Sequence, residues 1–221
     1  MMKKTKIVEL YTILLILGVI NSCTKVDNNP PVITLKGSNP DTLTLNAIYY
    51  DQGVSAIDDV TGNLTDRVTF SWLPEINKDS AATYHEIYTV VDANGNRDSV
   101  VRTVIVNNNA AFFYGKYTAN GNCDNIGPMS FYSEVRPSSF VNNNILFYNF
   151  GGFGSNIIDS AKFDSNTNQI TFFSGQSLGG NKTIVSGSGT VSGIAPNISI
   201  NINYLWTTGF AIDNCSLTYT K

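Results

Sequence analysis

The chain has 221 residues and a formal net charge of −3, with 14 Lys and Arg residues against 17 Asp and Glu residues. This balance leaves no basic footprint for nucleic acid, so we expect no nucleic-acid partner. One histidine and three cysteines provide no zinc-binding spacing, and the sequence has no phosphate loop of the Walker type. We therefore expect neither a metal nor a cofactor.

The N-terminus has the pattern of an export signal. Lys3, Lys4 and Lys6 form a basic stretch, and Leu10–Ile20 is an apolar run that is too short for a bilayer core, which needs about 20 apolar residues. A small residue then precedes Cys23. The pattern resembles the bacterial lipoprotein signal; the alternative is an ordinary cleaved signal peptide in which Cys23 is incidental.

The lipoprotein resemblance implies that residues 1–22 are removed and that Cys23 becomes the acylated, palmitate-bearing first residue. Lipid chains bind membranes at about 0.8 kcal/mol per buried methylene, so several chains on Cys23 would hold the protein firmly. Residues 23–29 then form a polar tether. The expected location is the cell envelope, on either the periplasmic or the surface face of the outer membrane.

The rest of the chain divides by charge near residues 107–109. Residues 30–106 carry 5 basic and 10 acidic side chains, whereas residues 110–221 carry 5 of each. Strand-type runs separated by turns rich in Gly and Asn recur in both halves, and no long helical period appears. We predict an all-β protein with domains at 30–106 and 110–221.

The first of these domains carries three ordered motifs. They are Asp-x-Gly-Val-x-Ala-x-Asp at 51–58, Gly-Asn-Leu-Thr-Asp at 62–66, and Tyr-x-x-x-Tyr-Thr-Val-x-Asp at 84–92 followed by an Asn-Gly-Asn turn. These motifs resemble the bacterial Ig-like family first described in insecticidal crystal proteins. The resemblance implies a seven-stranded β-sandwich that serves as a spacer or adhesion module.

One residue departs from the Ig-like pattern. Glu86 stands between Tyr84 and Tyr88, where an apolar residue is expected, and period 2 places it on their face of the strand. Glu86 either lies near a strand end or pairs with Arg97 or Arg102. The residues alone do not choose among these alternatives.

The second domain shows about eight apolar and β-branched runs at short spacing, which is typical of an antiparallel barrel, a meander or a sandwich. The pattern loosely resembles the lipocalin-like domains found behind Ig-like modules in Bacteroidetes lipoproteins. The predicted strands lie at 112–119, 129–136, 144–150, 157–163, 169–173, 182–191, 197–204 and 212–219.

Cys123 and Cys215 remain after Cys23 is assigned to the anchor. An exported protein with two thiols often pairs them, and they fall near the start and the end of the second domain. We predict a disulfide between them; closing a loop of about 90 residues would stabilise the domain by roughly 4–5 kcal/mol in the chain-entropy model. The alternative is two buried free thiols.

Ligand-binding candidates come from one aromatic and glycine-rich stretch and from a second segment near residue 209. Aromatic rings pack against the C–H faces of sugars and amides bond hydroxyl groups, so these residues suit a glycan; the alternative is ordinary packing of rings in a β-core. The candidates are Tyr148, Asn149, Phe150, Phe153, Trp206 and Phe210.

Clustered carboxylates in the first domain raise the alternative of a calcium site, because carboxylate oxygens are hard ligands. The residues concerned are Asp58, Asp59, Asp66 and Asp92. Their spacing matches no calcium loop. We expect these aspartates to cap turns through their own backbone hydrogen bonds.

Catalysis is not expected. His85 is the one histidine, it lies in a strand of the first domain, and no nucleophile elbow accompanies it. A glycoside hydrolase needs two facing carboxylates. The second domain offers Asp124, Glu134, Asp159, Asp164 and Asp213 for that role.

The sequence therefore favours an envelope lipoprotein in which an Ig-like spacer presents a β-rich head. The head would bind a glycan or another ligand, in connection with polysaccharide uptake. The alternative is a structural module that docks on another envelope protein. Short Asp-hydroxyl-aliphatic patterns also resemble the O-glycosylation signal of exported Bacteroidetes proteins, at Thr42, Ser80, Ser99 and Ser160.

Overall fold

The computed structural model describes residues 26–221, so the predicted signal peptide and the lipidation of Cys23 lie outside the described residues. No helix in this range is long and apolar enough to cross a bilayer. Contacts group the chain into two compact units. One comprises Met1–Thr34, described from residue 26, with Val54–Thr69 and Tyr88–Val100; the other comprises Leu35–Gly53, Phe70–Ile87 and Val101–Lys221.

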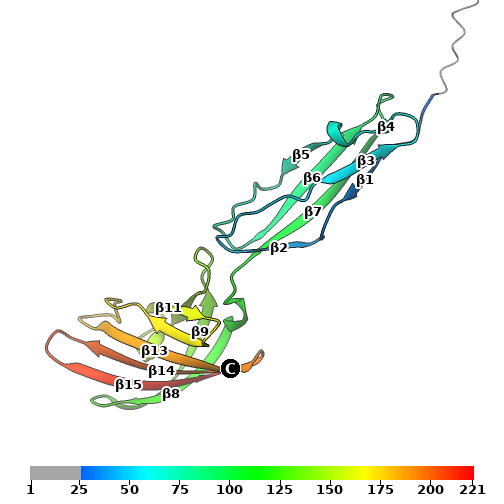
Figure 1. The fold of residues 1–221 in the computed structure, drawn as a ribbon. Helices are drawn as coiled ribbons and strands as arrows, with labels where there is room; N and C mark the ends of the chain where they lie inside the picture. Colours follow the sequence, from blue (N-terminus) through cyan, green and yellow to red (C-terminus); the bar gives the residue numbers. More distant parts are fainter. Residues whose placement is uncertain (1–25) are drawn as a thin grey trace, which may run out of the picture. The chain divides into compact units, whose positions relative to one another are not determined.

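Seven short strands make up the Ig-like region of the described chain (Figure 1). They form a three-stranded sheet in the order β1-β3-β4 and a four-stranded sheet in the order β2-β7-β6-β5, in which β2 runs parallel to β7. Their bounds are β1 (Val32–Leu35), β2 (Asp41–Thr44), β3 (Val54–Asp58), β4 (Gly62–Asn63), β5 (Thr69–Trp72), β6 (Thr83–Val91) and β7 (Arg97–Asn107).

Strand β6 shows why these residues form a two-faced sheet. Its burial alternates strictly, with Tyr84, Glu86, Tyr88 and Val90 buried and the residues between them partly exposed. This is the period-2 pattern of a strand with one face against a core. The turn after β6 needs a positive φ of 94° at Gly95, which explains the Asn-Gly pair there.

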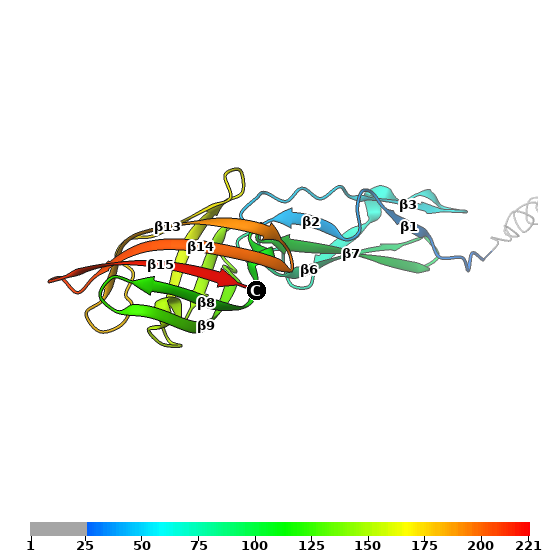
Figure 2. The same ribbon diagram turned by 90° about the horizontal axis from the view of Figure 1, so that it is seen from below.

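Eight further strands close into an antiparallel barrel in the order β10-β11-β12-β13-β14-β15-β8-β9. Figure 2 shows β13, β14, β15, β8 and β9 side by side. The prediction of an all-β chain with an Ig-like region and about eight further strands is confirmed. The bounds are β8 (Gly115–Cys123), β9 (Gly127–Pro137), β10 (Asn144–Tyr148), β11 (Ile158–Asp164), β12 (Gln169–Phe172), β13 (Thr183–Ile194), β14 (Asn197–Thr207) and β15 (Ile212–Thr220).

Aromatic and aliphatic side chains fill the barrel interior. Phe147 is fully buried among them, with its ring centroid 5.2 Å from that of Phe172 and 5.5 Å from that of Tyr219. An eight-stranded barrel is just wide enough for side chains to fill, so alternate residues of each strand supply this core. Phe112 and Phe113, predicted to begin the first strand, instead lie in the 3₁₀ turn η2 (Ala111–Phe113), which turns Phe113 into the core.

Candidate functional site

The outer face of β8, β9 and β10 carries a row of polar and aromatic side chains. The register pairs Lys116 with Glu134, and Glu134 with Tyr148, so these three residues lie across three neighbouring strands. Tyr132 stands two residues before Glu134 and therefore projects from the same face. We call the hollow of about 580 Å³ at this place the outer groove. It is lined by Lys116, Tyr132, Ser133, Glu134, Tyr148, Asn149 and Ser155.

Charges hold part of the outer groove in place. The Arg136 guanidinium lies 4.7 Å from the ring centroid of Tyr148 and donates a 2.8 Å hydrogen bond to Glu134 Oε2. That hydrogen bond, aided by the positive charges of Arg136 and Lys116, keeps the pKa of Glu134 below its usual value. Tyr132 is 78% exposed. The groove thus combines an open ring, a second ring covered by Arg136, and an ionised carboxylate.

Asn149 separates the outward side chain of Tyr148 from the inward side chain of Phe150. It adopts a left-handed conformation with φ of 58°, which Asn tolerates better than most residues. Its Nδ2 donates to the Tyr132 carbonyl at 2.8 Å, and its Oδ1 accepts from the Gly154 N–H at 2.9 Å. The Asn149 amide therefore fixes the loop under the outer groove.

The six predicted ligand-binding residues fall into three places. Tyr148 and Asn149 line the outer groove. Phe150, Phe153 and Trp206 pack in the barrel core, where Phe150 is fully buried and the Phe153 and Trp206 centroids lie 5.7 Å apart. Phe210 is 99% exposed in the turn between β14 and β15. Because strand alternation and the turn at Asn149 divide neighbouring residues between two faces, the predicted set is not one surface.

The barrel interior also contains buried polar atoms that the described residues leave without a hydrogen-bond partner. They include both carboxylate oxygens of Asp159, the Tyr204 hydroxyl, the Trp206 Nε1 and the Asp213 Oδ2. Burial raises the pKa of Asp159 to about 7, and burial together with the nearby Asp213 and Asp159 raises that of Tyr204. Buried polar groups in proteins are usually hydrogen-bonded, either to protein atoms or to internal waters.

The carboxylates considered for hydrolysis do not share one place. Asp124 and Asp164 are exposed, and Glu134 lies in the outer groove. Asp159 and Asp213 are buried, and the charges of both raise the pKa of the Tyr204 hydroxyl. Asp159 alternates with Ala161 and Phe163 on β11, so period 2 would have identified it as inward-facing.

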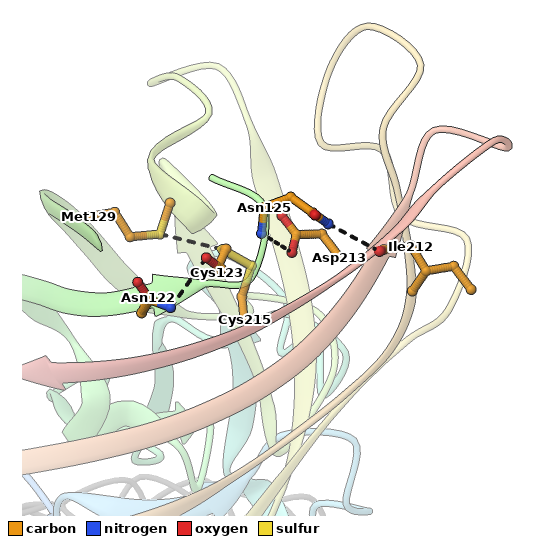
Figure 3. The surroundings of a disulfide bond; sticks show 7 residues. All are labelled: Asn122, Cys123, Asn125, Met129, Ile212, Asp213 and Cys215. Carbon is orange, nitrogen blue, oxygen red and sulfur yellow. Dashed lines mark hydrogen bonds between the residues drawn. A yellow bond between two sulfur atoms is a disulfide. The ribbon is translucent and has the colours of Figure 1, made fainter. Parts of the chain in front are cut away.

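A disulfide joins Cys123 and Cys215 at one end of the barrel (Figure 3). The two residues are directly paired in the register of β8 and β15. Beside them, Asp213 Oδ1 accepts the Asn125 N–H at 3.0 Å, and Asn125 Nδ2 donates to the Ile212 carbonyl at 3.4 Å. The bridge therefore crosses the seam where the first and last strands of the barrel meet.

In the Ig-like region, the four aspartates that were considered as a calcium site do not all lie together. Asp58 and Asp92 come together with Asp27, and one oxygen of each lies within 4.8 Å of the others. Asp59 instead accepts a 3.0 Å hydrogen bond from Asn29, and Asp66 is exposed on η1 (Thr65–Arg67). Asp27, in the predicted polar tether, is buried, and its carbonyl accepts a hydrogen bond from Asn96 Nδ2 at 3.0 Å.

The remaining predicted residues have simple surroundings. His85 lies on β6 with Nδ1 3.5 Å from Thr103 Oγ1. Thr42 and Ser99 are exposed and Ser80 is half-buried. Ser160 Oγ donates to Gln176 Oε1 at 2.9 Å, so this hydroxyl is already engaged.

Sequence reasoning missed Tyr132, Lys116 and Asp27. The alternation along β9 was available as a signal for Tyr132, because residues 128, 130, 132 and 136 are exposed between more buried neighbours. Lys116 belongs to the groove only through its cross-strand pairing with Glu134. Neither that pairing nor the burial of Asp27 leaves a local trace in the sequence.

Comparisons with known proteins support the Ig-like domain directly. Residues 33–106 match the family described as bacterial surface protein, Ig-like domain. The search of curated proteins found no match.

Three solved structures show distant likeness. A lipoprotein of Bacteroides thetaiotaomicron is 11% identical over 85% of this chain and 98% of that one, with a TM-score of 0.36. A Bacteroides ovatus protein of unknown function is 10% identical over 87% and 94%, with a TM-score of 0.39. The CBM51-2 and INT domains of Clostridium perfringens ZmpB, in complex with GlcNAc, are 11% identical over 85% and 43%, with a TM-score of 0.29.

Proposed function

We propose that this chain, which carries a bacterial surface Ig-like domain at residues 33–106, is a lipid-anchored envelope protein whose barrel binds a glycan. The observation that supports glycan binding is the outer groove. There an exposed Tyr132 ring lies beside an ionised Glu134 and a Lys116 ammonium in a hollow of about 580 Å³. That volume lies within the usual range of small-ligand sites.

The chemistry of the outer groove suits a sugar ring. The Tyr132 face offers an apolar platform for sugar C–H groups, because aromatic rings provide large contact area with a polar tip. Glu134 accepts hydrogen bonds from hydroxyl groups, and Lys116 and Ser155 donate them. A carboxylate that Arg136 already orients loses little freedom when a ligand binds.

Glycan arrays and calorimetry on the full chain test this proposal. Tyr132→Ala removes the open platform, and we expect affinity for the retained glycan to fall about tenfold, which corresponds to about 1.4 kcal/mol. Tyr114→Ala is the matched control, because Tyr114 is 60% exposed and does not line the groove. No retention of any glycan, or an equal loss in both variants, would overturn the proposal.

A second candidate function is docking on another envelope protein. The observation that favours it is a group of exposed apolar side chains at the disulfide end of the barrel: Phe210 is 99% exposed, Ile212 63% and Ile126 48%. Exposed apolar groups of this kind mark interaction surfaces when they are contiguous. Phe210→Ser is expected to leave glycan affinity unchanged if the outer groove binds the sugar. A loss of affinity as large as that expected for Tyr132→Ala would place the glycan site at this end of the barrel instead.

The proposed anchor is tested independently of the head. Metabolic labelling with a radioactive fatty acid is expected to mark the wild-type chain and not Cys23→Ala. Retained label in Cys23→Ala would overturn the lipid anchor without touching the glycan proposal. Mass measurement of the native protein shows in the same sample whether the hydroxyls of Thr42, Ser80, Ser99 or Ser160 carry sugar.

We further infer that the chain does not act as a hydrolase. His85, the one histidine, lies against Thr103 on the four-stranded sheet of the Ig-like region. The outer groove contains Glu134 as its one carboxylate, whereas glycoside hydrolysis uses a facing pair. Release of reducing sugar from a bound glycan would contradict this inference.

A further inference from the structure

Three aspartates from distant parts of the sequence meet in the Ig-like region. Asp27 precedes β1, Asp58 ends β3, and Asp92 follows β6. They are 6%, 4% and 7% exposed, and one oxygen of each lies within 4.8 Å of the others. All three belong to the same compact unit of the structure.

Turn capping explains only part of this arrangement. Asp58 Oδ2 accepts the Val60 N–H at 3.0 Å, and Asp27 Oδ1 accepts the Asn29 N–H at 3.0 Å. Asp92 Oδ1 accepts the N–H groups of residues 94 and 96, each at 2.8 Å. Each cap uses one carboxylate oxygen, and the second oxygen of Asp92 accepts a hydrogen bond from Asn96 Nδ2 at 2.7 Å.

For two of these aspartates, the second carboxylate oxygen is buried away from water. Asp27 Oδ2 and Asp58 Oδ1 are buried and accept no hydrogen bond from any described residue. Among residues 26–221, no ion pair of Lys, Arg or His with Asp27, Asp58 or Asp92 occurs. Buried charges in proteins are paired or coordinate metals, and among the described residues these carboxylates have no positive partner.

The turn that follows β6 holds Asp92 in place. Its two oxygens accept hydrogen bonds from the Asn94 and Asn96 N–H groups and from the Asn96 side chain. The turn therefore fixes the Asp92 carboxylate close to oxygens of Asp27 and Asp58.

The geometry points to a divalent-cation site formed by Asp27, Asp58 and Asp92, and we propose that it binds Ca²⁺. Calcium takes six to eight oxygen ligands at about 2.3–2.6 Å, so two ligands on opposite sides of the ion lie about 4.8 Å apart. Three oxygens that all lie within 4.8 Å of one another can therefore reach the same ion. Three carboxylates can supply up to six ligand atoms, and waters complete the shell.

The donor set discriminates against other ions. It contains oxygen only, whereas zinc sites draw on Cys and His. Magnesium requires near-ideal octahedral geometry at about 2.0–2.1 Å and gives up its waters reluctantly, so a cage of three converging protein carboxylates suits it less well. Bound calcium would tie the segment before β1 to the turns after β3 and β6.

Calorimetric titration of the full chain with CaCl₂, after treatment with a chelator, tests the site. We expect one bound Ca²⁺ per chain and a rise of about 5 °C in the unfolding midpoint of the Ig-like domain at saturating calcium. Asp58→Asn should lose both effects. Asp59→Asn, which changes the exposed neighbour, should keep both.

The sign of the stability change separates ligand binding from a purely structural role. Without calcium, Asp58→Asn removes one of three repelling charges and should leave the unfolding midpoint unchanged or higher; with calcium, it should be lower than that of the wild type. A variant that is destabilised equally with and without calcium would show that Asp58 acts only as a turn cap. A wild-type chain that binds no Ca²⁺, or binds Mg²⁺ more tightly, would overturn the proposal.

Discussion

Glu86 is a carboxylate at a strand position that should be apolar, and its partners explain how it is accommodated. It is 1% exposed, accepts a 2.8 Å hydrogen bond from the Tyr49 hydroxyl, and lies 3.7 Å from Arg102 Nε. Arg102 is fully buried and donates to two backbone carbonyls at 2.7 and 2.8 Å. Of the alternatives open at the sequence level, the partner is Arg102.

Removing one charge of this pair should destabilise the protein strongly. Glu86→Gln removes the buried partner of Arg102 and leaves it with the more exposed Asp51, whose Oδ1 lies 3.2 Å from Arg102 Nη1. Breaking a buried pair typically costs about 3–5 kcal/mol. Glu134→Gln is the control, because the Glu134–Arg136 pair is solvent-accessible and such pairs contribute about 0–1 kcal/mol. Urea unfolding of both variants measures the difference; equal losses would contradict the argument.

Asp159 should make barrel stability depend on pH. Its pKa rises from 3.8 to about 7 through burial, so between these values the folded state binds a proton that the unfolded state has released. The free energy of unfolding should therefore fall as pH rises from about 4 to about 7, by roughly 4 kcal/mol in total.

Two variants check that assignment. Asp159→Asn should flatten this part of the pH profile and stabilise the barrel at pH 8. Asp164→Asn, on the same strand, should preserve the profile, because backbone hydrogen bonds from residue 166 keep the pKa of Asp164 low. A profile that survives in Asp159→Asn would assign the proton to another group.

The pairing of β8 with β15 converts the eight strands from an open meander into a closed barrel. Their register runs from Cys215↔Cys123 to Thr220↔Thr118, and the disulfide lies at one end of this seam. Closure removes the two edges that a meander would expose. The disulfide therefore stabilises the β8–β15 pairing that closes the barrel.

Removal of both cysteines should cost roughly 4–5 kcal/mol in the chain-entropy model, because the bridge joins residues 92 apart in sequence. The variant with Cys123→Ala and Cys215→Ala avoids leaving one free thiol. Reduction of the wild-type chain is the matched condition and should reproduce the loss. A loss under about 1 kcal/mol would show that strand pairing alone holds the seam.

The proposed calcium site and the disulfide lie in different compact units. The Asp27–Asp58–Asp92 cluster belongs to one unit, and the disulfide belongs to the other. Effects at distant sites without shared partners usually add to within about 0.5 kcal/mol. Calorimetry of the full chain should therefore show that chelator and reductant each lower the free energy of unfolding, and that the two losses add. A loss on reduction that depends on calcium would contradict this expectation.

Much of the fold could be predicted because strand formation leaves a local pattern. The runs predicted at 144–150, 157–163 and 197–204 contain or overlap β10, β11 and β14, since alternation of apolar and polar residues needs only neighbouring positions. Turn chemistry was equally local, as at Asn94 and Gly95 after β6. The matched Ig-like segment likewise carries its motifs in short stretches.

The candidate sites were predicted less completely, because they depend on which strands become neighbours. Tyr148 and Asn149 were identified, but Tyr132 and Lys116 reach the same groove only through the β8-β9-β10 register. Phe150 was expected beside them but lies in the core. The left-handed conformation of Asn149 turns the chain so that the Phe150 side chain points inward.

Amino-acid order alone therefore specified the all-β class, the Ig-like motifs and the two cysteines available for pairing, since each follows from residue type and short-range spacing. Tertiary structure decided that the eight strands close, that Glu86 meets Arg102, and that Asp27 joins two aspartates far along the chain. The reason is physical: closure, register and the convergence of buried charges are set by long-range packing, which no local window of sequence contains.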